Sequence, residues 1–153
     1  MIKLNASIGI QKQTGIDFTL LSSILTSVLE SAHGRKINLN VKVHKSRIAE
    51  TSTCEYSSKR DFKIALDPSN ASKRYQWTAL LHELRHAIQW NLFNYWPNVT
   101  QYKSYNKYYT AIEEVDARKA EKMYSEIVKI YEYTVKAQDK FKSLGLNKIK
   151  GAR

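Results

Sequence analysis

Alternation of hydrophobic and polar residues marks several strands in the first half of the chain. Apolar residues fall at every second position from Ile37 to Val43, and Phe62, Ile64 and Leu66 repeat the pattern. This period of two is typical of strands with one buried face. We therefore expect strands in four segments, the third being less clearly patterned: Met1 to Ile10, Ile37 to Val43, Ile48 to Tyr56, and Phe62 to Leu66.

Apolar residues spaced three or four positions apart predict three helices. These cover about Thr19 to Ala32, Ser72 to Asn94 and Thr110 to Lys142. Asp17 or Thr19 can cap the first helix, and Gly34 follows its end. The order of strand, helix, several strands and two helices predicts an α+β fold, in which a small antiparallel or mixed sheet packs on the second helix and on the long C-terminal helix.

Length and composition fit one ordinary folded domain. The chain has 153 residues, of which 42% are hydrophobic, and it lacks the run of about 18 apolar residues that a membrane span needs. Its N-terminus alternates instead of forming an apolar secretory segment. The only cysteine, Cys54, excludes an intrachain disulfide, so we expect a cytoplasmic protein that does not enter a membrane.

The charge is strongly basic, with 25 lysines and arginines against 14 acids, a formal net charge of +11. From residue 136 onward, six basic residues face only Asp139. We expect one domain over residues 1–142 and a basic tail over residues 143–153. Such a tail either remains solvated or attracts nucleic acid or an acidic partner. The sequence contains no base-reading motif that would decide between these roles.

The second predicted helix carries the sequence His82-Glu83-Leu84-Arg85-His86 near its middle. On a helix, positions i and i+4 lie on one face, so both imidazoles can reach the same metal ion. Glu83 lies about 100° around the helix from His82, where it can address a water on that metal. The surrounding residues are apolar on most sides, and a buried His-Glu-His stripe is costly unless its groups are paired or bound to metal. This pattern is the His-Glu-x-x-His signature of zincins.

A catalytic zinc site needs a third protein ligand. No histidine follows His86, so the extended three-histidine pattern of metzincins is excluded and a carboxylate has to complete a His₂Glu set. The carboxylates that follow the motif are Glu113, Glu114, Asp116, Glu121, Glu126, Glu132 and Asp139. An N/N/O donor set with an open position makes zinc the expected ion.

The segment from Ser72 to Glu121 resembles small phage and bacterial zincins of the gluzincin type. In that family a second helix opens with Glu-x-Glu/Asp-Ala, and its first acid binds zinc. The sequence Glu114-Val115-Asp116-Ala117 matches this pattern. The resemblance implies Glu114 as the third ligand, a zincin-like fold, and action in a bacterial or phage-infected cell.

Helix-wheel arithmetic gives a competing position for the third ligand. The apolar face defined by Ala117, Ala120, Tyr124 and Ile127 is centred on Glu113, and Glu114 lies about 100° away from it. An irregular first turn, or an active-site helix lying against the flank of that face, would favour Glu114. We favour Glu114 and keep Glu113 as the alternative.

These residues predict a zinc metallopeptidase in which His82, His86 and Glu114 hold the metal and Glu83 is the general base. Tyr105, Tyr108 or Tyr109 could stabilise the oxyanion, and Arg85 could pair with Asp116, orient a substrate carboxylate or remain solvated. By analogy with zincins, the Phe62–Leu66 strand could present its edge to a peptide.

The alternative hypothesis is a non-catalytic zincin-like module that binds nucleic acid or a protein partner through its basic surface. The sequence indicates neither a cleavage specificity nor an oligomeric state.

Overall fold

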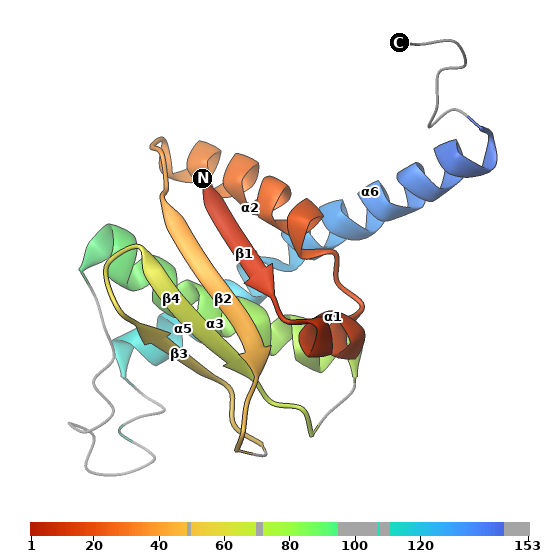
Figure 1. The fold of residues 1–153 in the computed structure, drawn as a ribbon. Coiled ribbons are helices and arrows are strands. Elements are labelled where there is room, and N and C mark those ends of the chain that lie inside the picture. Colours follow the sequence, from red (N-terminus) through yellow and green to blue (C-terminus); the bar gives the residue numbers. More distant parts are fainter. Residues whose placement is uncertain (49, 70–71, 95–106, 108–110, 146–153) are drawn as a thin grey trace.

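The computed structural model describes the chain except for residues 49, 70–71, 95–106, 108–110 and 146–153. It has an α+β fold with one mixed four-stranded sheet, as the sequence predicts (Figure 1). The elements in chain order are β1 (Ile2–Ala6), α1 (Ile8–Thr14), α2 (Phe18–His33), β2 (Leu39–Lys45), β3 (Thr53–Tyr56), β4 (Asp61–Leu66), α3 (Lys73–Phe93), α5 (Ile112–Met123) and α6 (Ser125–Ser143). None of the described helices is long and apolar enough to cross a membrane.

The sheet has the strand order β1-β2-β4-β3. β1, β2 and β4 are parallel, and β3 runs antiparallel to β4 along one edge. β4 is therefore an internal strand. The expectation that the Phe62–Leu66 strand offers a free edge is wrong, because β3 pairs with it from Thr53 to Tyr56. Among the strands that the structure describes, the edge on this side of the sheet is β3.

One face of the sheet carries the core and the other is polar. Ile2, Val41 and Ile64 are fully buried. α2 packs against β1, α3 packs against β3 and β4, and both helices lie behind the sheet in Figure 1. Their neighbours Lys42 and Lys63 are exposed on the opposite face. The period of two in the sequence therefore reports a sheet that is covered on one side only.

The first predicted strand is too long, because β1 ends at Ala6 and α1 begins at Ile8. The hydroxyl oxygen of Ser7 accepts a hydrogen bond from the backbone N–H of Ile10 and so caps α1. Ile8 is consequently exposed, whereas Ile10 is buried. Residues 8 and 10 continue the alternation only by coincidence, since the backbone has already become helical.

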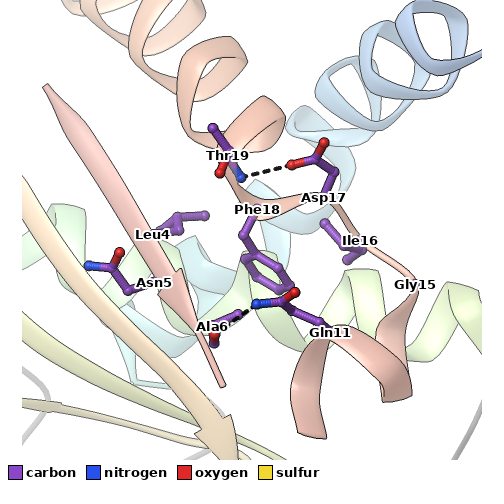
Figure 2. A pocket seen from close by; sticks show the side chains of 9 residues that line it. All are labelled: Leu4, Asn5, Ala6, Gln11, Gly15, Ile16, Asp17, Phe18 and Thr19. Atoms are coloured by element: carbon purple, nitrogen blue, oxygen red, sulfur yellow. Dashed lines mark hydrogen bonds between the residues drawn. The ribbon is translucent and has the colours of Figure 1, made fainter. Parts of the chain in front are cut away.

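α2 matches the prediction, and its two caps are those that the sequence indicates. The Asp17 carboxylate accepts from the backbone N–H groups of Thr19 and Leu20, and Gly34 adopts a left-handed conformation with φ 64°. A hollow of about 460 Å³ lies beside this N-terminus and the end of β1 (Figure 2). Asp17 is the only charged residue among those that line it, and it already serves as the cap.

α3 extends from Lys73 to Phe93, in agreement with the predicted helix from Ser72 to Asn94. The Ser72 hydroxyl caps its start by accepting from the backbone N–H of Tyr75, and Asn94 ends it in a left-handed conformation with φ 57°. α3 packs against β3, β4 and α5, so that it is buried on several sides. This packing explains the wide apolar coverage seen in its sequence.

The single long C-terminal helix of the prediction is instead two helices that meet at Tyr124. α5 packs against α3, whereas α6 turns away and packs against α2. The backbone N–H of Asp17 donates to the hydroxyl oxygen of Tyr131 at 2.8 Å and so ties α6 to the start of α2. The helical sequence continues through the break because each half has its own buried partner.

Asp67 joins the end of β4 to the start of α3. Its carboxylate accepts from the Tyr75 hydroxyl at 2.7 Å, from the Ser69 hydroxyl at 2.8 Å, and from the backbone N–H groups of Glu50 and Ser69. Burial raises the pKa of Asp67, but these hydrogen bonds outweigh it and lower the pKa to about 2. Asp67 thus fixes the position of the first turn of α3.

Asp67→Asn should lower the melting temperature by about 5 °C at pH 7, because an amide cannot accept all four hydrogen bonds. A depressed pKa gives stability that is present above the unfolded-state pKa and is lost as pH falls. The difference between wild type and variant should therefore shrink between about pH 4 and pH 2. Thermal unfolding across this range measures the effect, with Asp139→Asn on exposed α6 as the control. A difference that does not change with pH would contradict the assignment.

Candidate metal centre

His82 and His86 lie one turn apart on α3, and their Nε2 atoms approach each other to 3.2 Å. The helix is held from both ends by its caps and from both sides by the sheet and α5. His86 is buried, with 4% of its surface exposed, and His82 is half-buried. The spacing that the sequence predicts is therefore realised, with both ring nitrogens directed to the same point.

Glu114 reaches this point from the first turns of α5. Its Oε2 lies 3.1 Å from Nε2 of His82, and its Oε1 lies 3.1 Å from Nε2 of His86. Only 2% of Glu114 is exposed. His82, His86 and Glu114 form a group that could hold a metal ion.

The spacing of these donor atoms fits a small tetrahedral ion. Two ligands placed 2.0–2.1 Å from a tetrahedral zinc ion lie about 3.3 Å from each other. The two Nε2 atoms lie 3.2 Å apart, and each lies 3.1 Å from a different oxygen of Glu114, so that all these separations come close to this value. Two imidazole nitrogens and one carboxylate are also a donor set that zinc accepts.

The opposite ring nitrogen of each histidine has its own acceptor. The Nδ1 atom of His82 lies 2.8 Å from Oε1 of Glu121, and that of His86 lies 2.9 Å from Oε1 of Gln89. An acceptor at Nδ1 places the ring proton there and leaves the lone pair on Nε2 free for a metal. The roles of Glu121 and Gln89 as acceptors for the two rings were not predicted from the sequence. Their spacing could have indicated them, because Glu121 follows Glu114 by two helical turns and Gln89 follows His86 by three residues.

A second layer of hydrogen bonds locks α3 to α5. The Gln89 amide nitrogen donates to Oδ2 of Asp116 at 2.7 Å and to the carbonyl oxygen of Glu113 at 3.0 Å. Arg85 donates to Asp116 at 2.8 Å, so of the three roles considered for Arg85 the pairing with Asp116 is the one observed.

Glu113, the alternative third ligand, contributes its backbone carbonyl to this network, and its side chain is outside the donor group. The helix-wheel argument for Glu113 failed because it combined α5 with Tyr124 and Ile127. Those residues belong to the bend and to α6, so they do not share one continuous helical wheel with α5. α3 instead packs along the flank of α5 that carries Glu114.

Charges at the centre are strongly coupled. Burial lowers the pKa of His82, but its hydrogen bonds to Glu114 and Glu121 and the charge of Glu83 raise the pKa to about 9. Burial raises the pKa of Glu114, but the hydrogen bonds from His82 and His86 lower it to about 2. The carboxylates around the two imidazoles thus favour a positive charge between the rings. A bound divalent cation would provide that charge in place of a proton on His82.

Glu83 is buried beside the triad, with 8% of its surface exposed. Burial raises its pKa, while the charges of the two histidines act in the opposite direction. Its charge also raises the pKa of Cys54, after the larger effect of burial on that thiol. Since Cys54 is on β3, Glu83 is near the strand whose outer edge is free.

The three candidate oxyanion donors, Tyr105, Tyr108 and Tyr109, lie outside the described residues. The proposed tail is also largely outside them, since the described chain stops at residue 145. Comparison with models of protein families, with curated proteins and with solved structures finds no match for this chain. The interpretation of the site therefore depends on its own geometry.

Proposed function

We propose that the protein is a zinc-dependent peptidase, with His82, His86 and Glu114 as metal ligands. The observation that carries the proposal is the convergence of His82, His86 and Glu114: each Nε2 atom lies 3.1 Å from one oxygen of Glu114 and 3.2 Å from the other Nε2, next to the buried carboxylate of Glu83 on α3. Buried imidazoles and carboxylates at this density are costly unless an ion or a set of protons compensates them.

Zinc, when bound, would polarise the scissile carbonyl group and make a water acidic near neutral pH. Glu83 would remove the proton from the attacking water and deliver it to the leaving nitrogen. Its burial supports this role, because a carboxylate in an apolar setting accepts a proton more readily than one in water. Glu121 and Gln89 would hold the two rings in the orientation that keeps Nε2 available.

The edge of β3 supplies a means of holding an extended peptide. Its outer backbone groups are not used by β4, and an added strand could pair with them. β3 packs against α3, which brings such a peptide close to the helix that carries His82 and Glu83. This placement replaces the Phe62–Leu66 edge expected from the sequence.

A non-catalytic role in binding a polyanion is the second candidate, and one observation favours it. Lys42 and Lys63 are direct neighbours in the strand register and both lie on the open face of the sheet. Within the described part of the chain neither takes part in an ion pair. Salt-dependent binding of an oligonucleotide without hydrolysis of any peptide would favour this role.

Metal analysis combined with cleavage assays tests the peptidase. Purified protein should contain one zinc per chain, and it should cleave members of a fluorescence-quenched peptide library. A chelator should stop this cleavage and added zinc should restore it. Protein that carries no metal and recovers no activity with zinc would overturn the proposal.

Deleting residues 143–153 should leave cleavage intact and reduce only nucleic-acid binding.

Glu121→Ala should weaken zinc binding by about 10–100-fold, because the His82 ring loses the acceptor that fixes its proton at Nδ1. Glu121→Gln should largely restore the affinity, since its amide oxygen can still accept. Competition with a chromophoric chelator measures the affinity, and Glu132→Ala on exposed α6 is the control. An equal loss of zinc affinity in both Glu121 variants would show that the negative charge of Glu121, and not its orientation of the His82 ring, supports zinc binding.

A further inference from the structure

A groove of about 680 Å³ separates α3 from the C-terminal helices. It is formed on one side by the first two turns of α3 and on the other by the end of α5 and the start of α6. The bend at Tyr124 creates it, because α5 runs along α3 whereas α6 leaves α3 to pack against α2. Two helices that diverge from a common contact leave a wedge between them.

Three apolar side chains line part of the groove. Trp77 and Leu81 contribute from α3, and Val128 contributes from α6. The Trp77 ring meets the ring of Tyr131 edge to face, with centroids 5.2 Å apart, and Tyr131 is itself anchored by the backbone N–H of Asp17. The aromatic wall is therefore held in place before any ligand arrives, which reduces the entropy cost of binding.

The rim of the groove is cationic. Lys73, Arg74 and Lys122 are exposed and form no ion pair with any described residue. Of the two acids in the lining, Glu121 is engaged by His82 at 2.8 Å. Glu132 is exposed on α6 and is the acid that opposes these cations in the lining, whereas the lining cation Lys129 is paired with Glu126. The free positive charge is thus concentrated where α3 begins and α5 ends.

We propose that this groove is a docking site for an acidic protein segment that carries an apolar or aromatic residue. The three unpaired cations complement its carboxylates, and Trp77, Leu81 and Val128 accept its apolar side chain. The apolar residues distinguish this ligand from duplex nucleic acid, whose phosphate backbone is bound through charge. Binding of such a segment does not require hydrolysis, so it can be tested independently of the proposed peptidase activity.

Binding of a defined peptide tests the groove. The probe is a fluorescein-labelled hexapeptide with two glutamates on each side of a leucine–phenylalanine pair. The controls are the same peptide with lysines and the same peptide with two glycines in the centre. Anisotropy with the full chain at moderate salt should show saturable binding of the acidic apolar peptide and at least about tenfold weaker binding of both controls.

Charge reversal locates the site. Arg74→Glu and Lys122→Glu should each weaken binding of the peptide by about tenfold, while Lys3→Glu on β1 and Lys12→Glu on α1, both exposed outside the groove, should leave it unchanged within about twofold. Trp77→Ala should also weaken binding, and circular dichroism checks that it folds. Equal effects at both surfaces would show only attraction to net charge and would overturn the proposal. Displacement of the peptide by an oligonucleotide that fails to bind Arg74→Glu would assign the groove to phosphate instead.

Discussion

Glu83→Gln should abolish peptide hydrolysis and leave zinc bound at full stoichiometry. Glutamine has nearly the same shape as glutamate, so it can occupy the same buried space, but it cannot take a proton from water. The expected loss in kcat is about 10³-fold, which lies within the usual contribution of a general base. Steady-state cleavage of a library-derived peptide, with metal content measured on the same sample, checks both halves of this result.

Glu113→Gln is the matched control for this variant. It makes the same chemical change on α5, at a residue whose side chain is outside the donor group. Its kcat should remain within about twofold of wild type, because the carbonyl oxygen that it offers to Gln89 is unchanged. A Glu83→Gln protein that keeps its activity would show that Glu83 is not the general base, and it would leave the proposed metal ligands unaffected.

Glu114→Ala should eliminate stoichiometric zinc and, with it, the response of the protein to chelators. The two histidines alone offer two donors from one helix, whereas Glu114 binds from a second helix and completes the set. Metal that binds only the folded state stabilises it by about 4 kcal/mol at a thousandfold excess over its dissociation constant. Chelation should therefore lower the melting temperature of wild type but not that of the variant.

Zinc titration followed by differential scanning calorimetry measures this linkage. Glu113→Ala is the control and should behave as wild type in both metal content and chelator response. Zinc bound to Glu114→Ala with wild-type affinity would show that another residue provides the third ligand. Glu121 would then be the first candidate, since its carboxylate already lies 2.8 Å from Nδ1 of His82.

The sequence predicts the centre of the molecule better than its periphery. α3 has clear caps in Ser72 and Asn94 and a long apolar pattern, so its bounds and the shared face of His82 and His86 follow from local rules. The choice of Glu114 as the third ligand did not follow from local rules, because the family resemblance favoured Glu114 and the helix wheel favoured Glu113. The structure places Glu114 in the donor group because α5 presents its flank to α3.

Features that depend on tertiary packing could not be predicted from the sequence. Nothing local ends β1 at Ala6 except the cap by Ser7, which competes with an alternation that continues to Ile10. The bend at Tyr124 arises because α5 and α6 have different partners, and no proline or glycine marks it. The position of β4 inside the sheet depends on strand pairing between distant segments, which periodicity does not encode.

The strand order also constrains how the chain folds. β3 precedes β4 in the sequence, but β4 lies between β2 and β3 in the sheet, so β3 has no partner until β4 is present. Its pairing with β4 is local, closed by the Ser58 hydroxyl, which donates to Asp61 and accepts from the backbone N–H of Arg60. Hairpins of this kind form within microseconds, whereas parallel pairing of β2 with β1 and β4 spans long loops and is slower. We therefore expect the β3–β4 hairpin to form early and to dock as a preassembled unit, with His82 and His86 of α3 meeting Glu114 of α5 only after the sheet is complete.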